Sequence, residues 1–230
     1  MSNGSSRSSR GSGSASSSSW RTRWKPDRGH VAVAAETLLT LTGLLTGFRA
    51  EHPGVDIRLY QSSAPAMAEQ LRAGEVDLCF ASQPLPGPDL RTAELLREEV
   101  LLAVPPGHRL AERGRVRLAD VAGEPFVTTR PGYWPRELAD RVFAAAGLHP
   151  DYTCETDEPG ATGELIVAGL GVGLVPEFSR RPEAHARGVW LHLDAPDCYR
   201  SLTLVWRADA YFSVAAQRLS DFAREHFRNL

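Results

Sequence analysis

The runs HVAVAA (30–35), VDIRLY (55–60) and VDLCFA (76–81) decide the fold. Each is short and rich in apolar and β-branched residues, which is typical of buried strands. The apolar residues of the two intervening segments recur at helical spacing: Leu38, Leu41, Leu45 and Phe48 in the first, Met67 and Leu71 in the second. This β-α-β-α-β order, with connections of a few residues, predicts parallel strands joined by right-handed crossovers.

A second α/β series follows a break at QPLPGP (83–88). Between the break and the second series we expect two strands, at 90–96 and 99–104. After the second series we expect two more strands, at 189–193 and 202–206, and a C-terminal helix. The predicted fold class is therefore α/β, with two α/β subdomains and an interlobe cleft. Parallel strands bring their carboxyl ends and the following helix starts to one edge, where free N–H groups favour small polar ligands. Two such edges facing each other across a hinge would form a closable pocket.

The formal net charge of −2 is the sum of two unlike parts. Residues 1–28 are rich in Ser and Gly and carry six cations and one anion, whereas residues 29–230 carry twenty cations and 27 anions. The first part predicts a disordered basic tail, because it lacks the apolar residues needed to form a core. The acidic remainder argues against a broad nucleic-acid surface there.

Composition also excludes several classes of protein. No run approaches the ~18 consecutive apolar residues of a membrane-spanning helix, and the basic N-terminus lacks the apolar region of a secretory signal. The three cysteines are scattered and odd in number, which argues against a disulfide framework. We therefore expect a cytoplasmic protein with no membrane association.

Several stretches, taken in order, resemble the effector-binding domain of LysR-type transcriptional regulators. The resemblance covers residues 29–230 and rests on six segments in register: GHVAV (29–33), FRAEHPGV (48–55), LRAGEVDL (71–78), LLAVPPGHRL (101–110), VAGLGVGLVP (167–176) and LVWR (204–207). It implies a fold similar to type II periplasmic binding proteins. Effector subdomain I would comprise 29–104 plus 202–230, and effector subdomain II 105–201, with crossings near Val104-Pro105 and Ser201-Leu202.

The resemblance also implies the partners of the chain. A small-molecule effector would bind between the lobes, and the chain would form a homodimer or homotetramer through the side of subdomain I. Family members contact DNA through an N-terminal helix-turn-helix, whereas residues 1–28 contain no such pattern. DNA binding is therefore expected only through a helix-turn-helix domain absent from this chain.

Family effectors are held at strand ends and helix starts, and nine residues of this chain occupy such positions. The candidate ligand-binding residues are Glu36, Thr37, Ser62, Ser63, Ser82, Thr128, Thr129, Arg130 and Asp157. For Thr37 and Ser63, simple helix capping is an equal alternative. Ser62 and Thr129 are favoured, because strand ends leave them free to face the cleft.

Glu36 and Arg130 suggest opposite ligand charges. The family often carries Ser or Thr near position 36, so a carboxylate there either satisfies helix amides itself or selects an amine-bearing or neutral ligand. Arg130 could anchor a carboxylate, and a zwitterion such as an amino acid would reconcile the two. An organic acid is the other ligand class that we consider.

Other functions lack a matching set of residues. There is no GxSxG or HExxH motif, and the seven histidines are dispersed, so we expect neither a catalytic set, a metal site nor a cofactor. Glu98 and Glu99 are interpreted as solvated. The glycines of GLGVG (169–173) lie between a predicted helix and a strand, which favours a tight turn over a nucleotide site. The alternatives are a solute-binding protein of a transport system and an enzyme on the same two-lobe scaffold.

Overall fold

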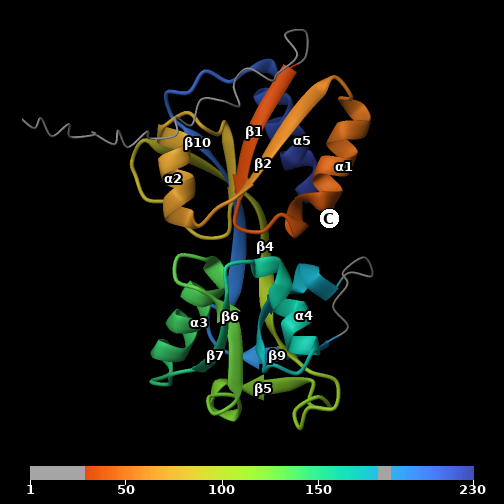
Figure 1. Ribbon diagram of the computed structural model, residues 1–230, viewed down its shortest axis with the longest axis vertical. Helices are drawn as coiled ribbons and strands as arrows, with labels where there is room; N and C mark the ends of the chain where they lie inside the picture. The colour runs from red at the N-terminus through yellow and green to blue at the C-terminus, as the bar shows by residue number, and fades with distance from the viewer. Residues whose placement is uncertain (1–28, 181–187) are drawn as a thin grey trace, which may run out of the picture.

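The chain forms two α/β lobes joined by a pair of long strands. The computed structural model describes residues 29–180 and 188–230, so the tail expected at 1–28 lies outside the described residues. Lobe I carries both the first described strand and the C-terminal helix, and lobe II lies below it in Figure 1. The two-subdomain α/β architecture predicted from the sequence is therefore confirmed.

The elements follow the alternation predicted from the hydrophobic pattern. The strands are β1 (Gly29–Ala35), β2 (Val55–Gln61), β3 (Leu78–Ala81), β4 (Leu90–Val104), β5 (Arg115–Arg117), β6 (Pro125–Thr129), β7 (Asp151–Thr156), β8 (Gly173–Pro176), β9 (Val189–Asp194) and β10 (Tyr199–Arg207). The α-helices are α1 (Thr42–Glu51), α2 (Ala64–Arg72), α3 (Trp134–Ala145), α4 (Thr162–Val167) and α5 (Val214–Arg228). Short 3-10 helices are η2 (Leu39–Leu41), η3 (Leu118–Asp120), η4 (Pro159–Ala161) and η5 (Glu177–Arg180).

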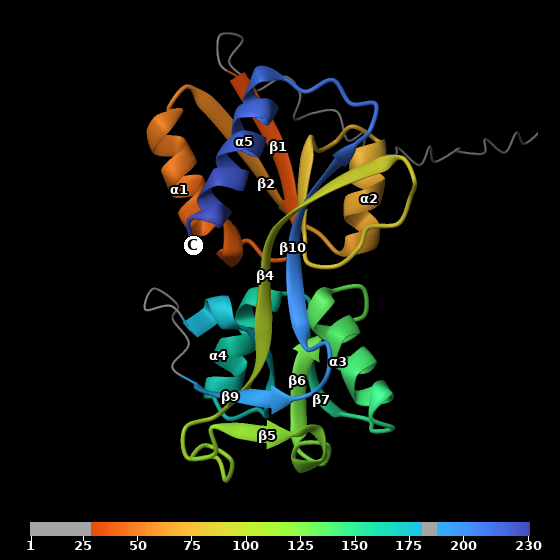
Figure 2. The ribbon, with the colours of Figure 1, turned by 180° about the vertical axis from the view of Figure 1, so that it is seen from behind.

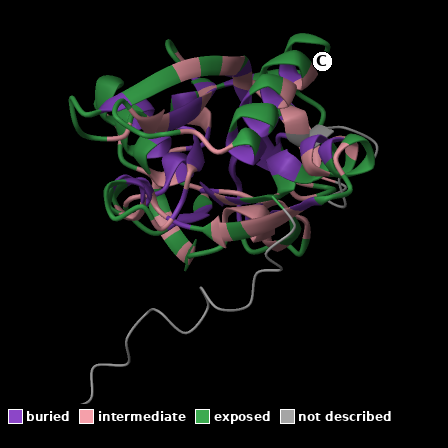
Figure 3. Ribbon diagram, turned by 90° about the horizontal axis from the view of Figure 1, so that it is seen from above, coloured by how far each residue is buried: buried purple, intermediate pink, exposed green. Residues whose placement is uncertain are grey.

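Lobe I is a sheet covered by helices on both faces. Strand β1 lies between β2 and β3 and is parallel to both, as the sequence predicted. Because it is central, β1 buries residues of both faces: Val31 and Val33 pack with α1 and α5, whereas Ala34 packs with α2. Seen from above in Figure 3, the buried residues lie in the middle of the sheet and on the inner sides of the helices.

Lobe II has a small parallel sheet beside the ends of the long strands. Strands β6 and β7 are parallel, and Phe126 of β6 bridges Val172 just before β8. Strand β4 pairs with β8 and β9 in this lobe. The core is built around Phe126, Phe143 and Leu138, which are at most 3% exposed.

Strand β4 connects the lobes as one continuous element. We expected two strands at 90–96 and 99–104, but residues 90–104 form a single strand that runs antiparallel to β10 between the lobes (Figure 2). Leu96 packs in the core of lobe I, whereas Val100 belongs to the core of lobe II. The boundary expected at Val104-Pro105 therefore moves toward Val100. On the return strand, Cys198 packs in lobe II and Leu202 in lobe I, beside the expected crossing.

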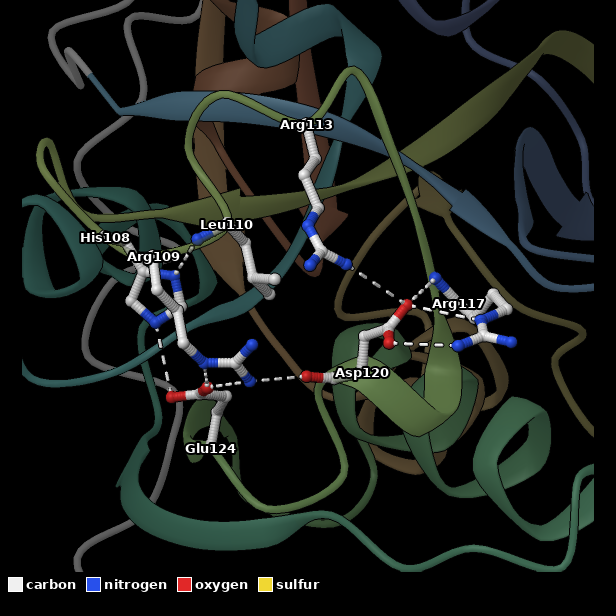
Figure 4. Close-up of polar contacts among 7 residues, drawn as sticks. All are labelled: His108, Arg109, Leu110, Arg113, Arg117, Asp120 and Glu124. Atoms are coloured by element: carbon white, nitrogen blue, oxygen red, sulfur yellow. Dashed lines mark hydrogen bonds and ion pairs between the residues drawn. The ribbon is translucent and has the colours of Figure 1, made fainter.

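A group of ion pairs holds the connection between β4 and β6 in lobe II. In Figure 4, the carboxylate of Glu124 faces both His108 and Arg109. Its Oε2 lies 3.2 Å from His108 Nε2, and its Oε1 lies 2.7 Å from Arg109 Nε. The Arg109 guanidinium also donates to the Asp120 carbonyl at 2.7 Å. These contacts join the PPGHRL segment (105–110) to Asp120 and Glu124, and they stabilise the loop that follows β4.

The glycines at 169–173 serve packing rather than nucleotide binding. Gly171 has a φ of 154°, and a Cβ built there would lie 2.2 Å from the carbonyl oxygen of Pro125. A Cβ at Gly173 would lie 2.5 Å from the carbonyl oxygen of Val127. The run therefore brings β8 against the backbone of β6 after α4, in agreement with the predicted tight turn.

In the described part of the chain, no helix has the length and apolar composition that crossing a membrane requires.

Replacing Gly171 by Ala should destabilise the protein by about 2–4 kcal/mol, because the methyl group meets backbone atoms that cannot move aside. The measurement is urea unfolding followed by circular dichroism. Gly114→Ala is the control, since a Cβ there has no neighbour within 4 Å, and its effect should stay within about 0.5 kcal/mol. Equal effects of the two substitutions would contradict the packing role of Gly171.

Candidate functional site

The carboxylate of Glu36 lies at the interface of the two lobes. Glu36 directly follows β1 and is fully buried. Its Oε2 accepts a hydrogen bond from the Ser82 backbone N–H at 2.7 Å, and its Oε1 accepts from Gln83 Nε2 at 2.7 Å. The same Oε1 accepts from the backbone N–H of Trp134 at 2.9 Å. Since Trp134 begins α3, one side chain connects the sheet edge of lobe I to a helix start of lobe II.

A second set of hydrogen bonds joins the two lobes near Glu36. The carbonyl of Gly132 in lobe II accepts from the Ala64 backbone N–H at 3.2 Å and from Gln83 Nε2 at 3.1 Å. Gly132 has a φ of 92°, where a side chain would be strained, and a Cβ there would lie 3.6 Å from the Cβ of Ser63. The glycine therefore lets lobe II approach the start of α2.

Burial controls the protonation of Glu36. Loss of solvent raises its pKa from 4.5 to about 7, against the lowering effects of the hydrogen bonds from Ser82, Gln83 and Trp134 and of the positive charge of Arg200. The carboxyl group is therefore divided between its two forms near neutral pH.

A buried ion pair lies at the crossing of the two long strands. Arg200 of β10 and Glu98 of β4 are register partners, and their side chains are 0% and 7% exposed. Arg200 Nε donates to Glu98 Oε1 at 2.9 Å, and the other carboxylate oxygen accepts from the Phe178 backbone N–H in lobe II at 2.6 Å. Burial lowers the pKa of Arg200, while the charge of Glu98 and the hydrogen bonds to it oppose that shift.

Arg200 also contacts both lobes. Its NH1 donates to the hydroxyl of Thr40 in lobe I at 3.3 Å. Its guanidinium carbon lies 5.2 Å from the centre of the Trp134 ring in lobe II, which is within cation–π range. The ion pair is therefore adjacent to the residue whose backbone binds Glu36.

Comparison with known proteins identifies the architecture. Residues 25–228 match the family model described as LysR substrate binding domain. The chain belongs to this family. It is 27% identical over 206 residues to the uncharacterized HTH-type transcriptional regulator YybE of Bacillus subtilis, covering 88% of this chain and 70% of YybE. A second B. subtilis relative, YwbI, is 26% identical, with 83% of this chain and 64% of YwbI covered. The chain thus spans about two thirds of the length of these relatives.

Solved structures agree with the family assignment. The effector binding domain of QuiR in complex with shikimate superposes with a TM-score of 0.75 at 22% identity, covering 88% of this chain and 98% of that one. The Synechocystis PCC6803 CcmR regulatory domain in complex with 2-PG gives a TM-score of 0.78 at 19% identity, covering 88% and 99%. At these identities the likeness concerns the fold.

In lobe I of this LysR substrate binding domain, the predicted residues directly follow the ends of β1, β2 and β3. Ser82 donates its backbone N–H to Glu36, and Ser62 is buried and donates its backbone N–H to Ala35 at 3.0 Å. Capping of the following helices by Thr37 or Ser63 was a wrong alternative. Ser63 precedes α2 without a side-chain capping bond, and a 3-10 helix rather than α1 follows Thr37.

In lobe II, several buried polar groups lack hydrogen-bond partners. Thr128 and Thr129 end β6 and are 1% and 0% exposed, and Thr162 begins α4 and is 3% exposed. Within the described residues, none of their hydroxyls has a hydrogen-bond partner, and neither has the indole N–H of Trp134. Buried polar groups are normally hydrogen-bonded, so these four groups have unused hydrogen-bonding capacity in this conformation.

Arg130 and Asp157 are exposed and lie beside a contact between the two lobes. Their side chains are 59% and 69% exposed and form an ion pair at 3.7 Å. The Asp157 carbonyl accepts from Gln61 Nε2 in lobe I at 3.3 Å. In this conformation Arg130 pairs with Asp157, and Glu36 accepts hydrogen bonds from Ser82, Gln83 and Trp134, so each of the two charges has a partner within the chain.

The sequence interpretation missed the residues that carry the interface. Gln83 was placed at the end of the third strand but was not chosen as a candidate. Glu98 was assigned to solvated surface, which is wrong because its side chain is buried against Arg200. A signal for this pair existed: Glu98 lies two residues from Leu96 and from Val100, so it shares a strand face with apolar residues. Arg200 lies likewise two residues from Cys198 and from Leu202. Their pairing depends on the register of β4 with β10, which the sequence does not show.

Replacing Glu36 by Gln should change how stability depends on pH. A carboxyl group with a raised pKa binds its proton more tightly in the folded state. The stability of the wild type relative to the variant should therefore fall by roughly 3 kcal/mol between about pH 4 and about pH 8. Urea unfolding at a series of pH values measures this difference. Glu51→Gln, at the exposed end of α1, should run parallel to the wild type, and a parallel curve for Glu36→Gln would contradict the raised pKa.

Breaking the buried ion pair should cost more than removing it. Arg200→Met or Glu98→Leu alone leaves a buried charge and should destabilise by about 3–5 kcal/mol, whereas the double variant should recover most of that loss. Unfolding midpoints in urea provide the double-mutant cycle. The exposed pair Arg207–Asp209 is the control and should show no measurable coupling. Additive losses at Arg200 and Glu98 would contradict the role of the pair.

Proposed function

We propose that this domain senses a small polar effector held between its two lobes, without catalysis, as part of a cytoplasmic transcriptional regulator that works as a dimer or tetramer. The curated relatives are named as HTH-type transcriptional regulators. DNA contact would therefore belong to a helix-turn-helix domain. These names support a regulator over a solute-binding protein or an enzyme, which are the other uses of a two-lobe scaffold.

The unpartnered hydroxyls of lobe II are the observation that carries the proposal. Thr128, Thr129 and Thr162 bury polar atoms that a folded protein normally pairs. In the proposed complex they bind the effector, together with the residues at the lobe I edge: Thr37, Ser62, Ser63 and Ser82. The solved relatives in complex with shikimate and 2-PG support a small polar molecule as the ligand.

The connection between the lobes suggests how the signal travels. Only the β4–β10 pair crosses between the lobes as regular strand structure in the described residues. An effector that binds one degree of lobe closure more tightly than another shifts the population toward it, by as much as its affinities for the two states differ. The altered lobe geometry would then change the spacing of the attached DNA-binding domains.

Thr129→Val tests the site with little effect on folding. Valine has nearly the same shape and removes a hydroxyl that has no partner, so stability should be unchanged or slightly increased. Effector affinity should fall about 3- to 10-fold, the equivalent of one hydrogen bond. Thermal-shift screening identifies the effector, and isothermal titration calorimetry measures its Kd.

Thr153→Val, at an exposed position of β7, is the matched control and should bind the effector like the wild type. A library of amino acids, organic acids, sugars and amides that leaves the Tm of the wild type unchanged would contradict the proposed function. An effector that binds both variants equally would instead contradict the assignment of Thr129.

A further inference from the structure

Three N–H groups around Glu36 form a receptor for a carboxylate. The donors come from Ser82, Gln83 and Trp134, lie 2.7–2.9 Å from the two oxygens and belong to both lobes. Both oxygens of one carboxylate are bound, one by two donors and the other by one. An acidic ligand between the lobes would need the same kind of N–H donors around its carboxylate. Here the Glu36 side chain occupies these donors instead.

We propose that Glu36 is a built-in ligand of the interlobe site, which replaces the carboxylate of an effector and restricts this domain to uncharged polar effectors. The restriction to one ligand class rests on the proposed function. The occupation of the donors by Glu36 does not, because it concerns contacts within the chain. The proposal extends the hypothesis from the sequence that Glu36 selects the ligand.

The charges around Glu36 explain why a second acid is excluded. Arg200 is the cation whose charge acts on Glu36, and it is already bound to Glu98. Two buried carboxylates thus share one guanidinium. A further carboxylate in the same site would face Glu36 while Arg200 is already bound to Glu98, and like charges in a buried site cannot both remain ionised.

The groups left for an effector are uncharged. The hydroxyls of Thr128, Thr129 and Thr162 donate and accept, and the indole N–H of Trp134 donates. Such groups match hydroxyl, carbonyl or amide groups of a small molecule. The loop of lobe II that precedes Trp134 is also held by an acid of its own, since Glu137 accepts the Gly132 backbone N–H at 2.9 Å.

Removal of the built-in carboxylate should create a site for small external carboxylates. Glu36→Ala leaves the three donors around an empty space that fits formate or acetate. In thermal-shift experiments, acetate at about ten times its Kd should raise the Tm of Glu36→Ala by roughly 3–6 °C. Chloride at matched ionic strength and acetamide should not. The wild type and the control Glu51→Ala, which lacks an exposed carboxylate on α1, should not respond to acetate.

Lobe closure gives an independent readout. Small-angle X-ray scattering should show a larger radius of gyration for Glu36→Ala than for the wild type, and formate or acetate should restore the smaller value. If Glu36→Ala does not fold in chloride, refolding from urea in acetate should rescue it, as followed by circular dichroism. Failure of acetate to stabilise or to rescue the variant would overturn the proposal. An equal response of the wild type to acetate would overturn it too.

These outcomes are separate from the fate of the proposed function. Rescue by acetate tests the carboxylate receptor whether or not the wild type binds an effector. The ligand screen on the wild type tests sensing itself. A carboxylic acid that binds the wild-type cleft with Glu36 displaced from Trp134 in a crystal structure would overturn the restriction to uncharged effectors and leave ligand sensing intact.

Discussion

The antiparallel pairing of β4 with β10 is the constraint on which the two-lobe structure depends. The core of lobe I ends and the core of lobe II begins along these two strands. A buried ion pair between Arg200 and Glu98 fixes the register of β4 with β10 there. Breaking such a pair leaves an uncompensated charge, so a slip of one strand along the other is strongly disfavoured. Thr40 of lobe I and Phe178 and Trp134 of lobe II contact this ion pair. The β4–β10 pairing therefore also determines how the two lobes face each other.

The contact between Glu36 and Trp134 follows from that geometry. Because the β4–β10 pairing is fixed, the end of β1 meets the start of α3. The Glu36 carboxylate then accepts backbone hydrogen bonds from Ser82 in lobe I and from Trp134 in lobe II. Burial makes this contact sensitive to protonation near neutral pH. The contact between the lobes is therefore stabilised by the hydrogen bonds of Glu36 and opposed by the cost of burying its carboxylate. Because these contributions oppose each other, a ligand can shift the population between two lobe arrangements.

The sequence predicted much of the fold and less of the site. Buried strands such as β1 and the order β-α-β-α-β follow from local hydrophobic pattern, and the close approach at Gly171 follows from the residue type. Thr128 and Thr129 were found as candidates because strand ends are visible in a sequence. Gln83, Glu98 and Arg200 were missed, because their partners lie on other elements and a polar residue in a strand looks the same whether it faces solvent or a buried charge.

By itself, the sequence determined the element order, the two α/β series and the family resemblance, since these depend on local periodicity and on segments in register. Only the tertiary structure decided that Glu36 binds lobe II rather than its own helix, and that Arg130 pairs with Asp157 in this conformation. The reason is physical: hydrogen bonds and ion pairs act over a few ångströms between residues that are far apart in the chain, and their partners exist only after the lobes have come together.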